Sequence, residues 1–431
     1  MNVLSDAELT LGLSRHLSAY AMAPERAALG NLEFAGQFFE MAFRLRGSTT
    51  SPASRVSAIG LDASLTPRTL KDVLATMETL GWVKVNRDPN GVPLSVNESI
   101  PAIPALISAG PRVLDMVAAE PVERAGLHLL RATTMQPLLT DEALEGGTAA
   151  AGGDQQAAEA AEAALRHLTG VRLIRRVTAA DGREVLYNPN VWTQGDQIAD
   201  TALRAADAKA TGEVGALLEE IAANPGMPEA HVTSTSAQWV AFAVTQGLVQ
   251  RSVIQTSEGR EQGFLFTPHL ARDPFGTTSG DASGQVRQLV GSMVYAATFA
   301  QFRLHSPDVF LRRLIDRGVA GDVSSIGTDY PMLERAGIVR VVPGSTTNKF
   351  RLELLQAEVA EEALTLLTAR DPQTGAPAEA SVLSGQRGYV HVERERARLA
   401  LTADTDEIEQ ARLLAALRDV STRRAMGGGS R

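Results

Sequence analysis

The sequence predicts a mainly α-helical protein with small β-hairpins, an α+β fold built from repeated units. Four times, a helix-like apolar stretch runs into a glycine, which is followed by apolar residues and a ribbon with a turn. These glycines are Gly81, Gly170, Gly247 and Gly337, and they are separated by 89, 77 and 90 residues. Such regular spacing indicates a repeated domain of about that size.

The four ribbons carry turn sequences at their tips, where residues that tolerate positive φ let two strands reverse. The tips are Asp88–Gly91, Asp181–Gly182, Glu258–Gly259 and Pro343–Ser345. A helix closed by glycine and followed at once by a β-hairpin is how a winged-helix unit ends. Over residues 30–370 the chain therefore resembles the winged-helix group of helix-turn-helix proteins. The resemblance implies tandem winged-helix domains that bind a partner, with DNA as the first expectation.

The composition limits the class of protein. At 431 residues the chain is long enough for three or four domains. It contains no cysteine, which excludes disulfide bonds, thiolate zinc sites and cysteine nucleophiles. No run of about 18 uncharged apolar residues occurs, and an N-terminus with Asp6 and Glu8 lacks the pattern of a signal peptide. We expect a cytoplasmic, nucleoid-associated protein with no membrane partner.

The charge is acidic overall but uneven. A formal charge of −9 argues against indiscriminate coating of nucleic acid, which usually requires a basic surface. Between Arg287 and Arg351, however, nine basic and five acidic residues give a balance of +4, which leaves −13 for the rest of the chain. Arginine and alanine abound while lysine is scarce, which is typical of a high-GC bacterium. An abundance of arginine alone therefore says little about DNA.

Residues 1–110 are predicted to hold an N-terminal helix and the first winged helix. Ser5 and Glu8 have the spacing of a capping box, so a helix is expected at 6–22. Thr66 is expected to cap the third helix of the unit, with Pro67 at its first position. The three helices of the unit are expected at 32–46, 53–61 and 67–80.

Residues 111–195 and 196–272 are predicted to form the second and third winged helices. In the second, helices near 122–134 and 155–168 are separated by a glycine- and alanine-rich stretch, 145–153, which is expected to be mobile. Its third helix is rich in alanine and glutamate, and the corresponding helix of the third unit contains no basic residue. We expect both helices to be poor readers of DNA.

A linker rich in glycine, serine and threonine, 273–284, precedes the fourth predicted winged helix, 285–370. Ser306 and Pro307 are expected to open a helix that Gly318 closes. A short third helix, a ribbon and a final helix are expected at 328–336, 338–354 and 355–368. Residues 371–431 are expected to form a linker, 371–387, and a charged tail that is helical near 405–424.

Motifs for catalysis are missing from the sequence. The seven histidines stand far apart, so a metal site is not expected. Neither a phosphate-binding loop with a lysine, nor a dinucleotide fingerprint, nor a Gly-x-Ser-x-Gly elbow occurs. We therefore expect neither an enzyme nor a cofactor.

The first unit carries the side chains that a winged helix needs for double-stranded DNA. In that family the third helix lies in the major groove and the ribbon reaches the backbone or minor groove. Basic and polar residues lie opposite the apolar face of the third helix and in the ribbon, although a solvated helix face with a routine turn is the alternative. The expected contacts are Arg55, Arg68, Thr69, Lys71, Lys84, Arg87 and Asn90.

The fourth unit is expected to bind differently. Asp329 and Glu334 on its third helix repel phosphate, so contacts should come from the ribbon and from the helix before the third one. A positive strip should then join the ribbons of the first and fourth units. Trp82 and Tyr330, which flank helix ends, are expected in the core. The expected contacts are Arg312, Arg313, Arg340, Asn348, Lys349 and Arg351.

Two functions are open on the sequence alone. The first is a non-enzymatic bacterial double-stranded-DNA-binding protein that regulates transcription or the replication or maintenance of a mobile element. The second is an architectural or adaptor protein whose winged helices contact proteins in a chromosome-organising or antiphage defence complex. The acidic total and the two non-basic third helices favour the second. An apolar stripe with Ile408 and Leu414 raises a homodimer as an alternative to packing within the chain.

Overall fold

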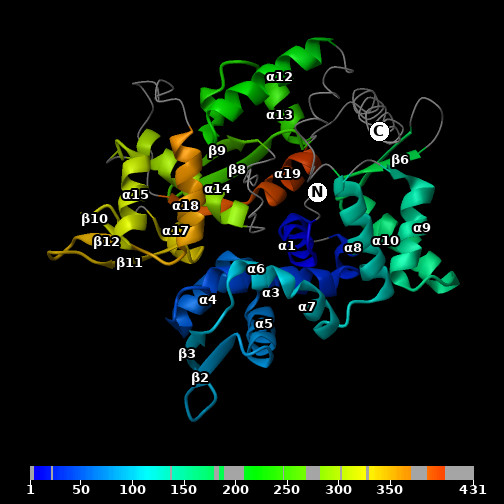
Figure 1. Cartoon of the computed structure of the whole chain (residues 1–431), viewed down its shortest axis with the longest axis horizontal. Helices are drawn as coiled ribbons and strands as arrows, with labels where there is room; N and C mark the ends of the chain where they lie inside the picture. Colours follow the sequence, from blue (N-terminus) through cyan, green and yellow to red (C-terminus); the bar gives the residue numbers. More distant parts are fainter. Residues whose placement is uncertain are drawn as a thin grey trace, which may run out of the picture.

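The computed structural model describes residues 4–20, 23–135, 138–178, 184–188, 208–245, 247–267, 282–300, 303–326, 330–369 and 386–402. Helices and small antiparallel sheets alternate along it, which confirms an α+β fold (Figure 1). The predicted tip at Asp181–Gly182, most of the two linkers and the helix at 405–424 lie outside the described residues.

One order of elements recurs four times. A helix leads into a short strand, further helical residues follow, and a hairpin ends the unit. In each sheet the short first strand pairs with the last strand, so the spatial order is first, third, second. The strand orders are β1-β3-β2, β4-β6-β5, β7-β9-β8 and β10-β12-β11, and the third sheet has a fourth strand, β13 (Gln386–Val390), beside β8. Residues 30–98, 121–187, 208–266 and 307–354 are called the first to fourth units below.

The first unit follows its sequence closely. The third helix begins at Pro67 as predicted, because the Thr66 hydroxyl accepts a hydrogen bond from the Thr69 amide at 3.1 Å. Gly81, with φ of 72°, turns the chain into the ribbon. The elements are α3 (Gly30–Leu45), β1 (Thr50–Pro52), α4 (Ala53–Asp62), α5 (Pro67–Thr79), β2 (Val83–Arg87) and β3 (Pro93–Glu98).

The second unit corrects one prediction. Most of the stretch 145–153 is helical, and two of its glycines lie where the helix approaches its neighbours closely. A Cβ on Gly147 would lie 3.2 Å from that of Ala161, and one on Gly146 would lie 2.5 Å from Nε2 of His128. The elements are α8 (Pro121–Met135), β4 (Leu138–Leu139), α9 (Thr140–Ala151), α10 (Gln155–Gly170), β5 (Arg175–Thr178) and β6 (Glu184–Tyr187).

Gly170 differs from the other three glycines of the repeat. It is the last residue of α10, and the positive φ, 55°, falls on Arg172. A Cβ on Gly170 would lie 2.8 Å from Cγ of Glu25. A side chain at this position would displace the Glu25 side chain, whereas the turn does not require a glycine here.

The third unit receives a strand from the C-terminal part of the chain. β13 (Gln386–Val390) pairs with β8, so two residues predicted as linker belong to a sheet. The unit consists of α12 (Ala208–Ala223), β7 (Met227–Pro228), the short 3-10 helix η1 (Glu229–His231), α13 (Ala237–Thr245), β8 (Gln250–Thr256) and β9 (Glu261–Phe266).

In the recurring order of elements, the helix that leads into the first strand of the fourth unit is α15. Gly318, with φ of 69°, closes α15 as predicted, but β10 follows it at once. The helix with Arg312 and Arg313 therefore corresponds in order to α3, and among the described residues the next helix along the chain is α17. The elements are α15 (Pro307–Arg317), β10 (Val319–Val323), α17 (Pro331–Arg335), β11 (Val339–Pro343) and β12 (Phe350–Leu354).

The remaining helices join the units. The capping box of Ser5 and Glu8 is confirmed, although α1 ends at Leu17 rather than at residue 22. α1 lies in the middle of the molecule against α3 (Figure 1). One apolar core runs from α1 through the first, second and fourth units and includes Ile254, Phe264 and Phe266 of the third, and a smaller core lies within the third unit. These helices are α1 (Asp6–Leu17), α2 (Pro24–Ala27), α6 (Ile103–Ser108), α7 (Gly110–Met116), α14 (Ala282–Thr298), α18 (Ala357–Thr368) and α19 (Val392–Thr402).

Candidate nucleic-acid interface

The outward face of α5 carries the predicted contacts of the first unit. Because Leu70, Val73, Leu74 and Met77 are buried on the other side, Arg68 and Lys71 are exposed. Neither forms an ion pair with any residue in the described ranges. Thr69 is half-buried, and its hydroxyl lies 2.8 Å from that of Thr66 within the cap. The first turn of α5 thus presents two uncompensated positive charges to solvent.

The ribbon of the first unit is held against α5 by an ion pair. The Arg87 guanidinium lies 2.6 Å from the Glu78 carboxylate, and this hydrogen bond lowers the pKa of Glu78. Lys84 is exposed and has no such partner among the described residues, whereas the neighbouring Val83 and Val85 are buried. Arg87 therefore positions the ribbon, and Lys84 is available for an external anion.

The tip of this ribbon is ordered by its own aspartate. The Asp88 carboxylate accepts hydrogen bonds from the amides of Asn90 at 2.9 Å and Val92 at 2.7 Å. The Asn90 side chain is exposed. Val92 and Leu94 are also exposed, at 55% and 58%, so this surface is apolar as well as polar.

Arg55 faces the fourth unit. Its Nη1 atom lies 3.9 Å from Oε1 of Glu334, and its side chain is 20% exposed. Burial lowers the pKa of its guanidinium. Arg55 is thus engaged between two units, unlike the exposed Arg68 and Lys71.

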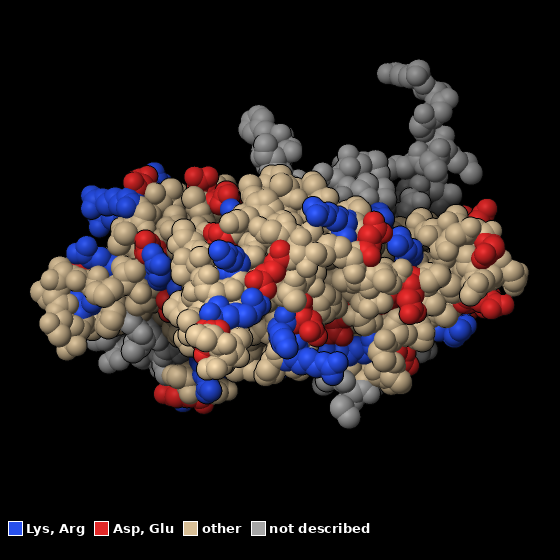
Figure 2. Space-filling view, turned by 90° about the horizontal axis from the view of Figure 1, so that it is seen from below, with Lys and Arg blue, Asp and Glu red and all other residues tan. Residues whose placement is uncertain are grey.

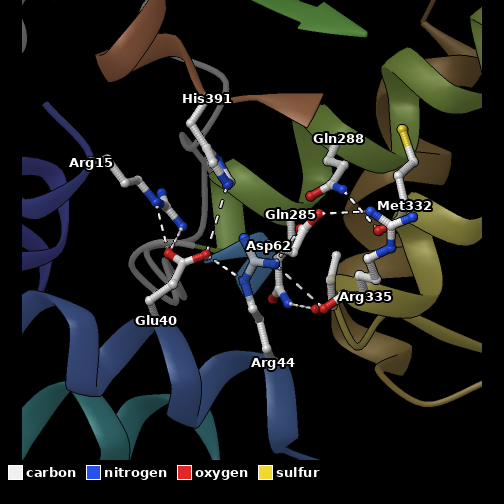
Figure 3. A network of polar contacts seen from close by, with 10 residues as sticks. Arg15, Glu40, Arg44, Asp62, Gln285, Gln288, Met332, Arg335 and His391 are labelled. Atoms are coloured by element: carbon white, nitrogen blue, oxygen red, sulfur yellow. Dashed lines mark hydrogen bonds and ion pairs between the residues drawn. The ribbon is translucent and has the colours of Figure 1, made fainter. Parts of the chain in front are cut away.

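The third helix of the fourth unit packs against other parts of the protein on several sides. None of the residues from Tyr330 to Ala336 is exposed. Gln288 Nε2 donates to the Met332 carbonyl at 3.1 Å, and Gln285 Nε2 donates to the Ala336 carbonyl at 2.8 Å (Figure 3). α17 therefore lacks the free outward face that α5 has. Trp82 and Tyr330 are both buried, as predicted.

A buried charge network that the sequence analysis missed joins these units. The Glu40 carboxylate lies 2.7 Å from Nη2 of Arg15 and 2.6 Å from Nε of Arg44 (Figure 3). Nε2 of His391 lies 3.8 Å from the same carboxylate. Burial alone raises the pKa of Glu40, but Arg15 and Arg44 hold that pKa well below its usual range. Burial and Arg15 lower the pKa of His391. The sequence feature that could have indicated this network is the presence of Glu40 and Arg44, four residues apart, within the apolar helix 30–45.

Six side chains of the fourth unit were predicted to contact DNA, and two of them are paired. Arg340 lies 2.5 Å from Glu353, and Arg351 lies 3.5 Å from Asp322. Arg312 and Arg313 are exposed on α15, and Asn348 and Lys349 are exposed in the turn before β12. The structure thus brings part of the predicted set to the surface beside an open groove. Arg303 and Arg317 also line this groove, and the sequence analysis predicted neither the groove nor these two arginines. The spacing of Arg313 and Arg317 on one helix face was the signal.

The ribbons and the surface charge were expected to form one path. In Figure 1 the β2–β3 ribbon extends downward and the β11–β12 ribbon extends to the left, so they do not point to opposite sides. On the face in Figure 2, groups of Lys and Arg alternate with Asp and Glu. Basic residues therefore form separate patches on this face rather than one uninterrupted strip.

No protein-family model matches the chain, and no curated protein has a significantly similar sequence. Among the described residues, no helix combines the length and apolar character needed to cross a bilayer.

Proposed function

We propose that this chain is a non-enzymatic bacterial protein built of tandem winged helices that binds double-stranded DNA. It would act as a regulator of transcription, or of the replication or maintenance of a mobile element. In the proposal α5 enters the major groove, and the β2–β3 ribbon reaches the adjacent backbone or minor groove. The second and third units orient the binding unit and contribute little contact of their own.

The recurring strand order supports the winged-helix part of the proposal. In all four units a short strand that precedes the third helix pairs with the last strand of the hairpin. This arrangement places the hairpin beside the end of the third helix, as in the first unit, where Arg87 links β2 to Glu78 on α5. Helix and ribbon then present one continuous surface.

The observation that carries the DNA part is the pair Arg68 and Lys71 on the first turns of α5. Both are exposed and unpaired within the described residues, and Lys84 lies on the neighbouring ribbon. A protein of charge −9 that leaves such charges uncompensated on a capped helix is suited to meet a polyanion locally. Phosphate contacts of this kind supply affinity and register rather than sequence information.

The test is duplex binding as a function of salt. The full chain should bind mixed genomic fragments at about 50 mM salt, with affinity that falls steeply as salt rises. The R68A/K71A variant should bind more weakly, and its log–log salt slope should be reduced by about 2. The R166A/R260A variant removes the same charge from exposed sites on α10 and the β8–β9 turn and should bind like the wild type. Equal affinity of all three proteins would refute the proposal.

A second candidate is an architectural or adaptor protein of a chromosome-organising or antiphage defence complex. The specific observation in its favour is the exposure of Val92 and Leu94 on the ribbon of the first unit, because adjacent exposed apolar side chains are typical of protein interfaces. Under this alternative, duplex DNA does not bind even at about 50 mM salt. A V92S/L94S variant would then lose a protein partner that the R68A/K71A variant retains.

A further inference from the structure

The fourth unit contains an open groove of about 1200 Å³. Its walls are one face of α15, strand β10 and the turn that precedes β12. Phe310, Arg313 and Arg317 all line it, because side chains three and four residues apart share a helix face. Sites for small molecules in proteins commonly have volumes of about 300–1000 Å³. The groove is therefore large enough for a ligand of that class.

The groove is strongly basic although the chain is acidic. The described residues that line it include five cationic side chains and one acidic one, a balance of +4 in a protein of charge −9. The five are Arg303, Arg313, Arg317, Lys349 and Arg351. This concentration of charge favours an anion with several negative groups.

The acidic residue of the groove, Asp322, already has hydrogen-bond and ion-pair partners within the protein. Asp322 accepts a hydrogen bond from the Ser345 amide at 2.8 Å and lies 3.5 Å from Arg351. It therefore fixes the turn of the ribbon and compensates one arginine. Arg313, Arg317 and Lys349 are exposed and form no ion pair with other residues of the described chain. These three charges are the ones available to a ligand.

The same groove has an apolar wall. Phe310 and Leu304, which are half-buried, line it, and so do the buried Tyr330 and Ile326. An aromatic surface beside several cations suits a ligand that combines phosphates with a flat ring. A bare inorganic anion would use only half of this surface.

We infer that the groove binds a nucleotide, whose phosphates contact Arg313, Arg317 and Lys349 and whose base lies against Phe310. Two sources share this chemistry, a free nucleoside triphosphate and a nucleotide within a single strand. The site is separate from α5, and the inference does not depend on duplex binding by the first unit.

Calorimetry on the full chain tests the inference with ATP, tripolyphosphate and a short oligothymidylate as probes. ATP is expected to bind with a Kd below about 1 mM, and R313A/R317A and K349A should each weaken it, the double variant at least about tenfold. Both arginines are exposed, so the double variant should keep the wild-type Tm. F310A should weaken ATP but leave tripolyphosphate unchanged, which separates the base from the phosphates.

The outcomes distinguish the sources and the two sites. Binding of oligothymidylate without ATP, with the same response to the variants, identifies a strand as the source. The R68A/K71A and R166A/R260A variants should bind ATP like the wild type, whatever their affinity for duplex DNA. The inference is overturned if neither ATP nor oligothymidylate binds, if R313A/R317A binds them as tightly as the wild type does, or if F310A has no effect on them.

Discussion

Asp62 and Arg335, which are 273 residues apart in the sequence, form an ion pair of 3.1 Å. Asp62 ends α4 of the first unit, and Arg335 ends α17 of the fourth. The same carboxylate also lies 2.7 Å from Nη1 of the buried Arg44. Asp62 therefore couples the surface contact between two units to the charge network in the interior.

Removal of the Asp62 charge should loosen the first unit from the fourth. The D62N variant leaves Arg44 with one carboxylate fewer, and we expect a loss of about 1.5–3 kcal/mol in the free energy of unfolding, measured by urea denaturation. D115N breaks an ion pair with Arg124 whose partners are 71% and 49% exposed. Its effect should stay below about 1 kcal/mol. Equal effects of the two variants would contradict the coupling.

The Glu40 carboxylate should be essential to the fold. In E40Q, Arg15 and Arg44 remain buried while the charge between them is lost, and the expected cost is about 3–5 kcal/mol by chemical denaturation. Glu162 provides the matched control because it forms a loose, exposed pair with Arg166 at 3.9 Å. E162Q should change stability by less than about 0.5 kcal/mol. A small effect of E40Q would show that water reaches the network.

Acid should destabilise the protein through His16. Burial lowers the pKa of His16 from 6.5 to about 4, and its Nε2 lies 2.6 Å from the Val171 carbonyl. Below pH 6.5 the unfolded chain binds a proton that the folded chain does not, so stability falls as the pH decreases toward 4. From this histidine alone we expect a loss of about 3 kcal/mol between pH 7 and pH 4. H16Q should flatten that part of the stability curve, and an unchanged curve would rule out this role.

Two glycine substitutions should have opposite signs. A Cβ on Gly36 would lie 2.1 Å from the Thr10 carbonyl oxygen, so α1 and α3 must separate, and G36A should cost about 1–3 kcal/mol. Gly12 on α1 has nothing within 4 Å of the same position. G12A should therefore stabilise the protein by about 0.5–1 kcal/mol, because alanine favours the helix. Thermal unfolding of both variants decides the matter, and a stabilised G36A would mean that the two helices cross less closely.

The sequence predicts those parts of the fold that depend on local interactions. Thr66 with Pro67 defines the start of α5, and Gly81, Gly247 and Gly337 have the positive φ that a helix end before a ribbon requires. Gly170 shows the limit of this reasoning, because the positive φ falls on Arg172 and the neighbour of the glycine is Glu25, which is distant in the sequence. The helix α9 was missed for a similar reason, since its glycines are explained by packing against α8 and α10.

The parts of the candidate site that depend on local sequence were predictable as well. Helical periodicity correctly places Arg68 and Lys71 on the exposed side of α5. It gives no information about which charges meet in the folded chain, so neither the pair of Arg55 with Glu334 across two units nor that of Arg351 with Asp322 within the fourth unit was foreseen. The groove beside α15 was missed because it forms only when a helix, a strand and a turn come together.

The pairing of β13 with β8 has a consequence for biosynthesis. The ribosome makes β8 by residue 256 but must add everything up to residue 385 before the partner strand emerges. During that interval the nascent chain carries an edge strand whose backbone N–H and C=O groups are unpaired, and such an edge can form hydrogen bonds with other polypeptide chains. Premature termination anywhere in this interval would leave that edge permanently open, so we expect truncated products to be cleared by proteases or to aggregate.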